Sequence, residues 1–133
     1  MTLEDKIQNR LVADTESILE DNLDRVEKLF QFHSDGTIDI QPQYRDITPQ
    51  NRIMIYFTAQ RFAKEGNISD TDTLDTDFFY ERFDRGERTI RNDLQALRES
   101  GFISKDGRSS HRIVVENLPK VLTQIEEDVS TND

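Results

Sequence analysis

A β-hairpin signal that directly follows three helical segments is the strongest indication of the fold. Asp106-Gly107 joins two short extended pieces, and an Asp-Gly pair is typical of a tight hairpin turn. Upstream, apolar residues recur at helical spacing in three segments, which span residues 48–66, 77–83 and 87–100. This order predicts a mainly α-helical domain that carries a small β-hairpin over residues 102–115.

The ends of these helical segments carry capping residues. Thr48-Pro49 offers an N-cap followed by proline at the first helical position, and Asp77 is a good cap for the short second helix. Gly101 supplies a C-terminal stop for the third helix. The dense apolar run from Ile53 to Ala63 predicts that the first of the three is the most buried helix.

The N-terminal segment predicts a long helix that covers more than one surface. From Leu3 to about Phe32 the chain has no glycine or proline and repeats apolar residues at helical spacing. These residues spread over about 200° of the helix surface, which is wider than the seam of a coiled coil. We expect this helix to pack on the rest of the domain and on a second copy of the chain. The alternative is a core helix with no role in association.

Shorter signals complete the expected organisation. Residues 37–40 alternate like a short edge strand, Asn117 can cap a final helix, and the tail from about Asp128 is expected to fray. We therefore divide the chain into an N-terminal packing or dimerisation segment, a central domain and a frayed tail, with the bounds 1–47, 48–127 and 128–133.

Composition excludes several function classes. The chain has 133 residues, no cysteine and two histidines, so disulfides, thiolate metal sites and a standard structural zinc site are not expected. No catalytic constellation or glycine-rich phosphate loop is present, and we predict no enzyme activity, no cofactor and no small-molecule ligand. No apolar run approaches the roughly 20 residues of a membrane span, and the N-terminus lacks a signal peptide. We expect a cytoplasmic protein with no membrane partner.

The charge is unevenly distributed along the chain. The formal net charge is −10 overall, and it is −6 over residues 1–50, −3 over 51–84, +3 over 85–112 and −4 over 113–133. The single basic stretch is where contact with a polyanion is expected.

Aspartate exceeds glutamate by 16 to 11 and arginine exceeds lysine by 12 to 5. This pattern is typical of halophilic proteins, and an ordinary acidic protein is the alternative.

The third helical segment resembles a known DNA-binding family. Residues 87–94 read Glu-Arg-Thr-Ile-Arg-Asn-Asp-Leu, and Leu97 and Gly101-Phe102-Ile103 follow. This resembles the recognition helix and the start of the wing in the DeoR-type bacterial regulators. The resemblance covers about Phe79 to Ile103 and implies a winged helix-turn-helix domain, preceded here by the long N-terminal helix. It carries over only the DNA-binding module.

Three positions depart from the pattern of that family. Arg85 stands where the family buries a small apolar residue in the turn, and Gly86 stands where its usual serine cap would be. Asn92 replaces the second arginine of the recognition helix. The departures at Arg85 and Gly86 imply a turn of different shape.

The helix over residues 87–100 divides into an apolar face and a polar face. Ile90, Leu94 and Leu97 share one side at 100° per residue, which leaves the opposite side to arginine and amide side chains. Arginine can bond guanine in a bidentate manner, and asparagine or glutamine can bond adenine. We assign base edges to Arg88, Asn92 and Gln95, and phosphate contacts to Arg91, Arg98 and Thr89.

The predicted hairpin adds further polar residues, namely Lys105, Arg108, Ser109 and Arg112, with Ser110 and His111 between them. Arg108 lies near the hairpin tip, where it could reach the DNA backbone or an adjacent minor groove. A solvated hairpin with charges that protect its edges is the alternative.

Together these patterns predict a homodimer, joined through the N-terminal helix, that binds duplex DNA. Its role would be that of a small transcriptional or plasmid- or virus-type regulator. The alternative is a winged-helix protein-interaction module, or a subunit of a larger assembly, with no direct DNA contact. Such a scaffold would depend on Phe30, Phe32 or the N-terminal apolar stripe.

Overall fold

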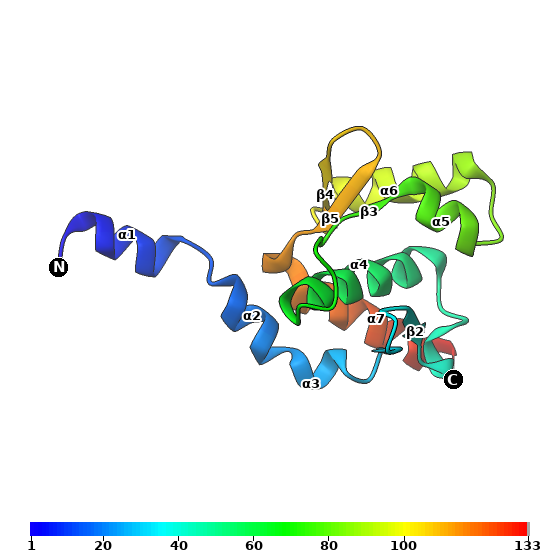
Figure 1. The fold of residues 1–133 in the computed structure, drawn as a ribbon, viewed down its shortest axis with the longest axis horizontal. Helices are drawn as coiled ribbons and strands as arrows, with labels where there is room; N and C mark the ends of the chain where they lie inside the picture. The colour runs from blue at the N-terminus through cyan, green and yellow to red at the C-terminus, as the bar shows by residue number, and fades with distance from the viewer. Residues whose placement is uncertain (133) are drawn as a thin grey trace.

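The computed structural model describes residues 1–132 and is mainly α-helical, with two small antiparallel β-sheets (Figure 1). The predicted fold class is confirmed at this level. In chain order the elements are α1 (Leu3–Leu11), α2 (Thr15–Asp21), α3 (Leu23–Val26), β1 (Phe30–Phe32), β2 (Ile38–Ile40), the 3-10 turn η1 (Pro42–Tyr44), α4 (Pro49–Glu65), β3 (Leu74–Asp75), α5 (Thr76–Arg82), α6 (Glu87–Glu99), β4 (Ile103–Asp106), β5 (Ser110–Ile113), the 3-10 turn η2 (Val115–Asn117) and α7 (Leu118–Asn132).

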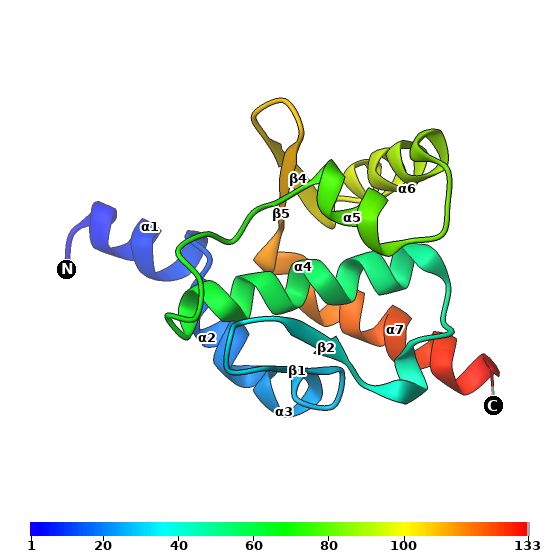
Figure 2. The ribbon, with the colours of Figure 1, turned by 45° about the vertical axis from the view of Figure 1, so that its right-hand side comes forward.

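Helix α4 forms the centre of the core, as its dense apolar run predicts. Ile53, Ile55 and Phe57 are fully buried. In Figure 2, α5, α6 and the β4–β5 hairpin lie on one side of α4, while α2, α3 and the β1–β2 pair lie on the other. Helix α7 runs alongside α4 and buries Leu118, Leu122 and other residues of its inner face. The core therefore fixes α6 and the hairpin on one end of the molecule.

The N-terminal segment is helical, as predicted, but it is divided into three short helices. Val12 is extended and separates α1 from α2. Asp14 then begins α2 as an N-cap, because its carboxylate accepts hydrogen bonds from the backbone N–H and the hydroxyl of Ser17. An aspartate cap starts a new helix and so interrupts the predicted continuous one.

Residues at the end of the predicted long helix belong instead to a β-strand. Phe30 pairs with Ile40 and Phe32 with Ile38 across an antiparallel ladder. The predicted strand near residues 37–40 is thus confirmed, and it takes its partner from the segment expected to be helical. Aromatic and β-branched residues that face each other across a pair stabilise such a ladder.

The short helix α5 is capped by Asp75 and not by Asp77. The backbone N–H of Phe78 donates to the Asp75 carboxylate at 2.9 Å. Leu74 pairs with His111 and keeps the chain extended up to Asp75, and α5 therefore begins at Thr76. Leu74 and Asp75 therefore contribute a third strand to the hairpin sheet, with strand order β3-β5-β4.

The C-terminal tail was expected to fray from Asp128, but α7 continues through this residue to Asn132. The Asp128 carboxylate accepts hydrogen bonds from the hydroxyl and the backbone N–H of Thr48 and from the Asn51 side chain. Thr48 is the N-cap residue of α4 and Pro49 its first helical residue, as predicted, but the Thr48 side chain bonds to Asp128 and makes no capping hydrogen bond to α4. Asp133, the last residue of the predicted tail, lies outside the described residues.

Within residues 1–132, no helix has both the length and the apolar character that crossing a bilayer requires.

Candidate nucleic-acid interface

Helix α6 and the hairpin that follows it have the predicted bounds and faces. Ile90, Leu94 and Leu97 are at most 4% exposed, whereas Arg88 and Asn92 on the opposite face are exposed. At the end of α6, Gly101 has a φ of +80°, a conformation that glycine adopts without a steric penalty. The chain reverses there into β4, which places the hairpin beside α6.

An ion pair ties the turn before α6 to the helix. Asp93 is 8% exposed and accepts hydrogen bonds from Arg85 at 3.1 Å and from Gln50 of α4 at 3.2 Å. Arg85 is one of the three residues that depart from the pattern that the sequence resembles, and this ion pair is what it forms here. It joins the turn to α6 through charge, where the related pattern has an apolar contact.

A hollow of about 290 Å³ lies between α6 and the hairpin. Its polar lining consists of Arg91, Asn92, Gln95 and Arg98 from α6, and Lys105, Arg108 and His111 from the hairpin. We call this surface the basic hollow. It brings together six of the ten residues that the sequence assigns to DNA contact, and its lining contains four cations and no carboxylate.

Several of these cations have no carboxylate partner. In residues 1–132, no carboxylate oxygen lies within 4.0 Å of the charged nitrogens of Arg88, Arg98, Lys105 or Arg108. Among the described residues, Arg91 has one carboxylate partner, Glu87 at 3.9 Å, and it also donates a hydrogen bond to the Tyr80 hydroxyl at 3.5 Å. The positive charge of the basic hollow is therefore largely uncompensated within the chain.

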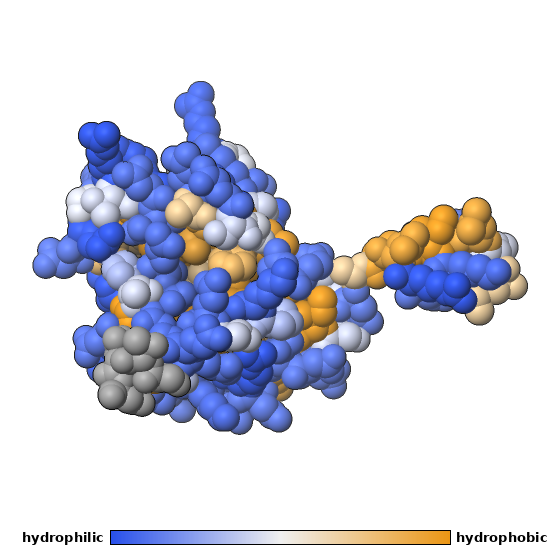
Figure 3. All heavy atoms as spheres, turned by 180° about the vertical axis from the view of Figure 1, so that it is seen from behind, coloured by the Kyte–Doolittle hydropathy of each residue, from blue (hydrophilic) through white to orange (hydrophobic). Residues whose placement is uncertain are grey.

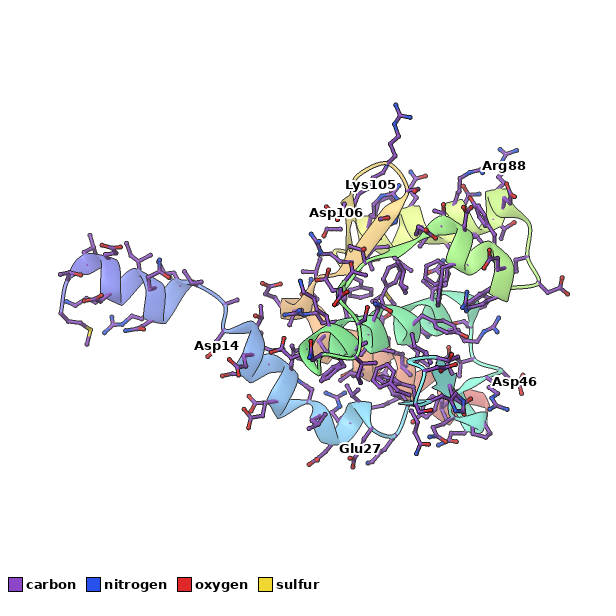
Figure 4. All side chains as sticks on the ribbon, in the orientation of Figure 1. Asp14, Glu27, Asp46, Arg88, Lys105 and Asp106 are labelled. Atoms are coloured by element: carbon purple, nitrogen blue, oxygen red, sulfur yellow. The ribbon has the colours of Figure 1, made fainter. Side chains whose placement is uncertain are left out.

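Arg88 and Thr89 lie on the exposed first turn of α6, next to the basic hollow but outside its lining. Figure 4 shows Arg88 and Lys105 at the same edge of the molecule, while Glu27 and Asp46 lie at the opposite edge. Part of the acidic surface thus faces away from this end of the protein.

Arg112 is not brought together with the other predicted residues. It is paired with Ser104 in the hairpin, whereas Lys105 is paired with His111, and adjacent residues of a strand point to opposite faces. Arg112 instead donates hydrogen bonds to Asp72 at 3.2 Å and to Asp106 at 3.3 Å. Ser109, at the hairpin turn, is also outside the hollow; its carbonyl accepts a hydrogen bond from the N–H of Thr76.

His111 is a site residue for which the hairpin pattern predicts no specific contact. It is 2% exposed, and its Nε2 lies 2.8 Å from a guanidinium nitrogen of Arg98. Guanidinium groups only donate, so Nε2 accepts and the neutral ring carries its proton on Nδ1. His111 therefore positions Arg98 at the edge of the basic hollow. His111 and the apolar Ile113 are two residues apart, and such residues of a strand point to the same face. This spacing is the signal that could have placed His111 on the inner face.

The environment of His111 keeps its ring neutral. Burial lowers its pKa from 6.5 to about 4, and the positive charges of Arg98 and Lys105 lower it in the same direction. No described residue accepts a hydrogen bond from Nδ1, which is buried. Protonation would turn Nε2 into a donor and break the hydrogen bond with Arg98.

Comparisons of the chain with protein families, with curated proteins and with solved structures return no match.

Proposed function

We propose that the protein binds duplex DNA as a small winged helix-turn-helix regulator, with α6 in the major groove and the hairpin on the backbone or minor groove. The basic hollow is the observation that carries this proposal. A chain with a net charge of −10 gathers four cations and two amides on one surface without a carboxylate among them. Such a local concentration of positive charge is suited to a polyanion.

The shape of the surface favours a duplex over a small anion. An exposed helix of 13 residues is about 20 Å long, and the major groove of B-DNA admits an α-helix. The hairpin stands beside the helix, where it can follow the phosphate backbone. A pair of such units in a homodimer would address two half-sites about 34 Å apart, or at another spacing set by the dimer.

The side chains divide into two roles. Arg88, Asn92 and Gln95 offer bidentate partners for base edges, and Thr89 can donate its hydroxyl to a phosphate. The cations Arg91, Arg98, Lys105 and Arg108 contact phosphates, and Arg98 does so from the position that His111 fixes. Arg112 is left out of the interface, because Asp72 and Asp106 hold it.

The salt dependence of binding tests this proposal. Four phosphate contacts per subunit predict that the logarithm of the association constant falls with the logarithm of the salt concentration at a slope of about −3.5 per subunit. The measurement is fluorescence anisotropy with labelled duplexes of random sequence, in KCl from about 0.1 M to molar concentrations.

Absence of binding at every salt concentration, with folding verified by circular dichroism, would reject the proposal. It would favour a winged-helix module that binds another protein. Binding with no salt dependence would also count against it, because a contact with the phosphate backbone releases counterions.

A further inference from the structure

Helix α1 has an apolar face that is exposed along its whole length. Leu3 is 72% exposed, Ile7 41% and Leu11 77%, and no residue of the helix is buried. Figure 1 shows α1 projecting away from the body, and Figure 3 shows an apolar strip along this arm. The exposed strip is the kind of surface that marks an interaction site.

The sequence of α1 is nevertheless that of a helix. Thr2 and Asp5 form a capping box, in which each side chain accepts a hydrogen bond from the backbone N–H of the other. A helix of nine residues is only marginally stable in water without packing. A capped but unpacked helix therefore requires a partner surface.

The apolar strip of α1 is bordered by basic residues along one edge and by Glu4 at the other. Leu3, Ile7 and Leu11 are four residues apart and so lie on one face. At 100° per residue, Lys6 and Arg10 lie along one edge of this strip, and Asn9 lies on the opposite side of the helix. The arm therefore presents an apolar face with a basic edge.

A second surface of the chain has the complementary character. A hollow of about 500 Å³ lies between α2, α3, β1 and the end of α4. Apolar side chains, among them Leu19, Leu23, Val26, Phe30 and Phe62, line it. The same hollow is lined by Glu16, Glu20, Glu27 and Glu65. We call it the acidic groove.

The carboxylates of the acidic groove are mostly unpaired. Glu65 forms an ion pair with Arg61 at 3.5 Å. No lysine, arginine or histidine nitrogen in residues 1–132 lies within 4.0 Å of the carboxylates of Glu16, Glu20 or Glu27. The groove thus combines an apolar surface with free negative charge, which matches the apolar strip and basic edge of α1.

We propose that α1 of one copy docks in the acidic groove of a second copy, and that the second copy returns the same contact. Such an exchange buries both arms in a closed two-fold dimer. The chain leads the arm away from its own groove, because Val12 is extended and Asp14 is fixed by its two hydrogen bonds to Ser17. This contact gives the proposed regulator its dimer interface, but it is tested without DNA.

Charge reversal of each surface tests the exchange. The variants are K6E/R10E on the arm and E20K/E27K on the groove, all at exposed positions. Each variant alone faces like charges and should dimerise at least about 10-fold more weakly than wild type in 0.15 M KCl, where charges are incompletely screened. An equimolar mixture should form a heterodimer, because both of its contacts again join opposite charges. Analytical ultracentrifugation measures all three samples.

A matched pair of variants tests the apolar part of the contact. I7D places a charge in the apolar strip, and N9D places the same charge on the opposite face of the same helix. I7D should weaken dimerisation at least about 10-fold, while N9D should leave it within about 2-fold of wild type.

The other outcomes overturn the proposal. A wild-type monomer, or dimerisation that resists I7D and both charge reversals, would exclude the exchange. Monomeric charge variants that do not combine on mixing would show that the arm folds back on its own chain or binds another protein. Since no DNA is present, failure of this test leaves the DNA-binding proposal to its own measurement.

Discussion

Replacing both Arg88 and Arg91 with alanine lowers the affinity for duplex DNA by about 100-fold or more. One arginine is assigned to a base edge and the other to a phosphate, and each contact of this kind is worth about 1–3 kcal/mol. Both side chains are exposed, so the fold should not change. The measurement is fluorescence anisotropy on a labelled duplex selected from random sequences for tight binding to the wild type, because a base-edge contact adds affinity only at its own base. Folding is checked by circular dichroism.

The control for this variant removes two positive charges elsewhere. Lys64 and Lys120 are exposed and lie outside the basic hollow, so K64A/K120A changes the net charge equally. This control should retain affinity within about 5-fold, because screening weakens the effect of distant charges. An equal loss in both double variants would mean that net charge governs binding and that α6 is not the contact surface.

The free energy of unfolding should fall by about 3 kcal/mol as the pH is lowered from 6.5 to 4, through His111 alone. Its pKa is lowered from 6.5 to about 4 by burial and by the charges of Arg98 and Lys105. The unfolded chain therefore takes up a proton in this range before the folded chain does, and stability decreases with falling pH. The contribution levels off about one pH unit below 4, where both states hold the proton.

Urea unfolding of the wild type and of H111Q between pH 7 and 4 measures this effect. Glutamine does not titrate and can still accept a hydrogen bond from Arg98, so the variant should lose most of the slope. The carboxylates with lowered pKa, such as Asp14 and Glu126, also make stability depend on pH at the lower end of this range. They are present in both proteins, so they do not contribute to the difference between the two slopes. Equal slopes in the two proteins would show that His111 does not stay neutral in the folded state.

The parts of the fold that were predicted correctly depend on local signals. The helical spacing of Ile90, Leu94 and Leu97, the stop at Gly101 and the Asp106-Gly107 turn each lie within a few residues of the structure they specify. Helix α6 and its hairpin consequently have nearly the predicted bounds. The face of α6 that lines the basic hollow follows from the same spacing.

Some errors were local, such as the Asp14 cap that divides the predicted long helix. Others arose where residues outside a helical turn decide the structure. Phe30 and Phe32 fit a helical pattern, but they pair with Ile40 and Ile38 in a strand. The tail from Asp128 was predicted to fray, but Asp128 accepts hydrogen bonds from Thr48 and Asn51. These bonds join segments that are far apart in the sequence, so the local pattern does not reveal them. Local propensity does not contain these contacts, which tertiary packing supplies.

The same limit applies to the candidate site. The register of the hairpin decides that Arg112 points away from Lys105, and a composition of basic residues does not specify a register. The hairpin pattern places His111 only between the predicted contact residues, although its hydrogen bond to Arg98 makes it part of the site. Arg85 was seen only as a departure from a pattern, since its partner Asp93 lies across the turn.

Photocrosslinking from single positions tests most directly whether the α6 surface meets DNA. A benzophenone side chain replaces Asn92 in the basic hollow or, as the control, Asp46 at the opposite edge of the molecule (Figure 4). With labelled duplexes of random sequence, we expect light-dependent capture of DNA from position 92 and none above background from position 46. Equal capture from both positions, or capture from position 46 alone, would contradict the account.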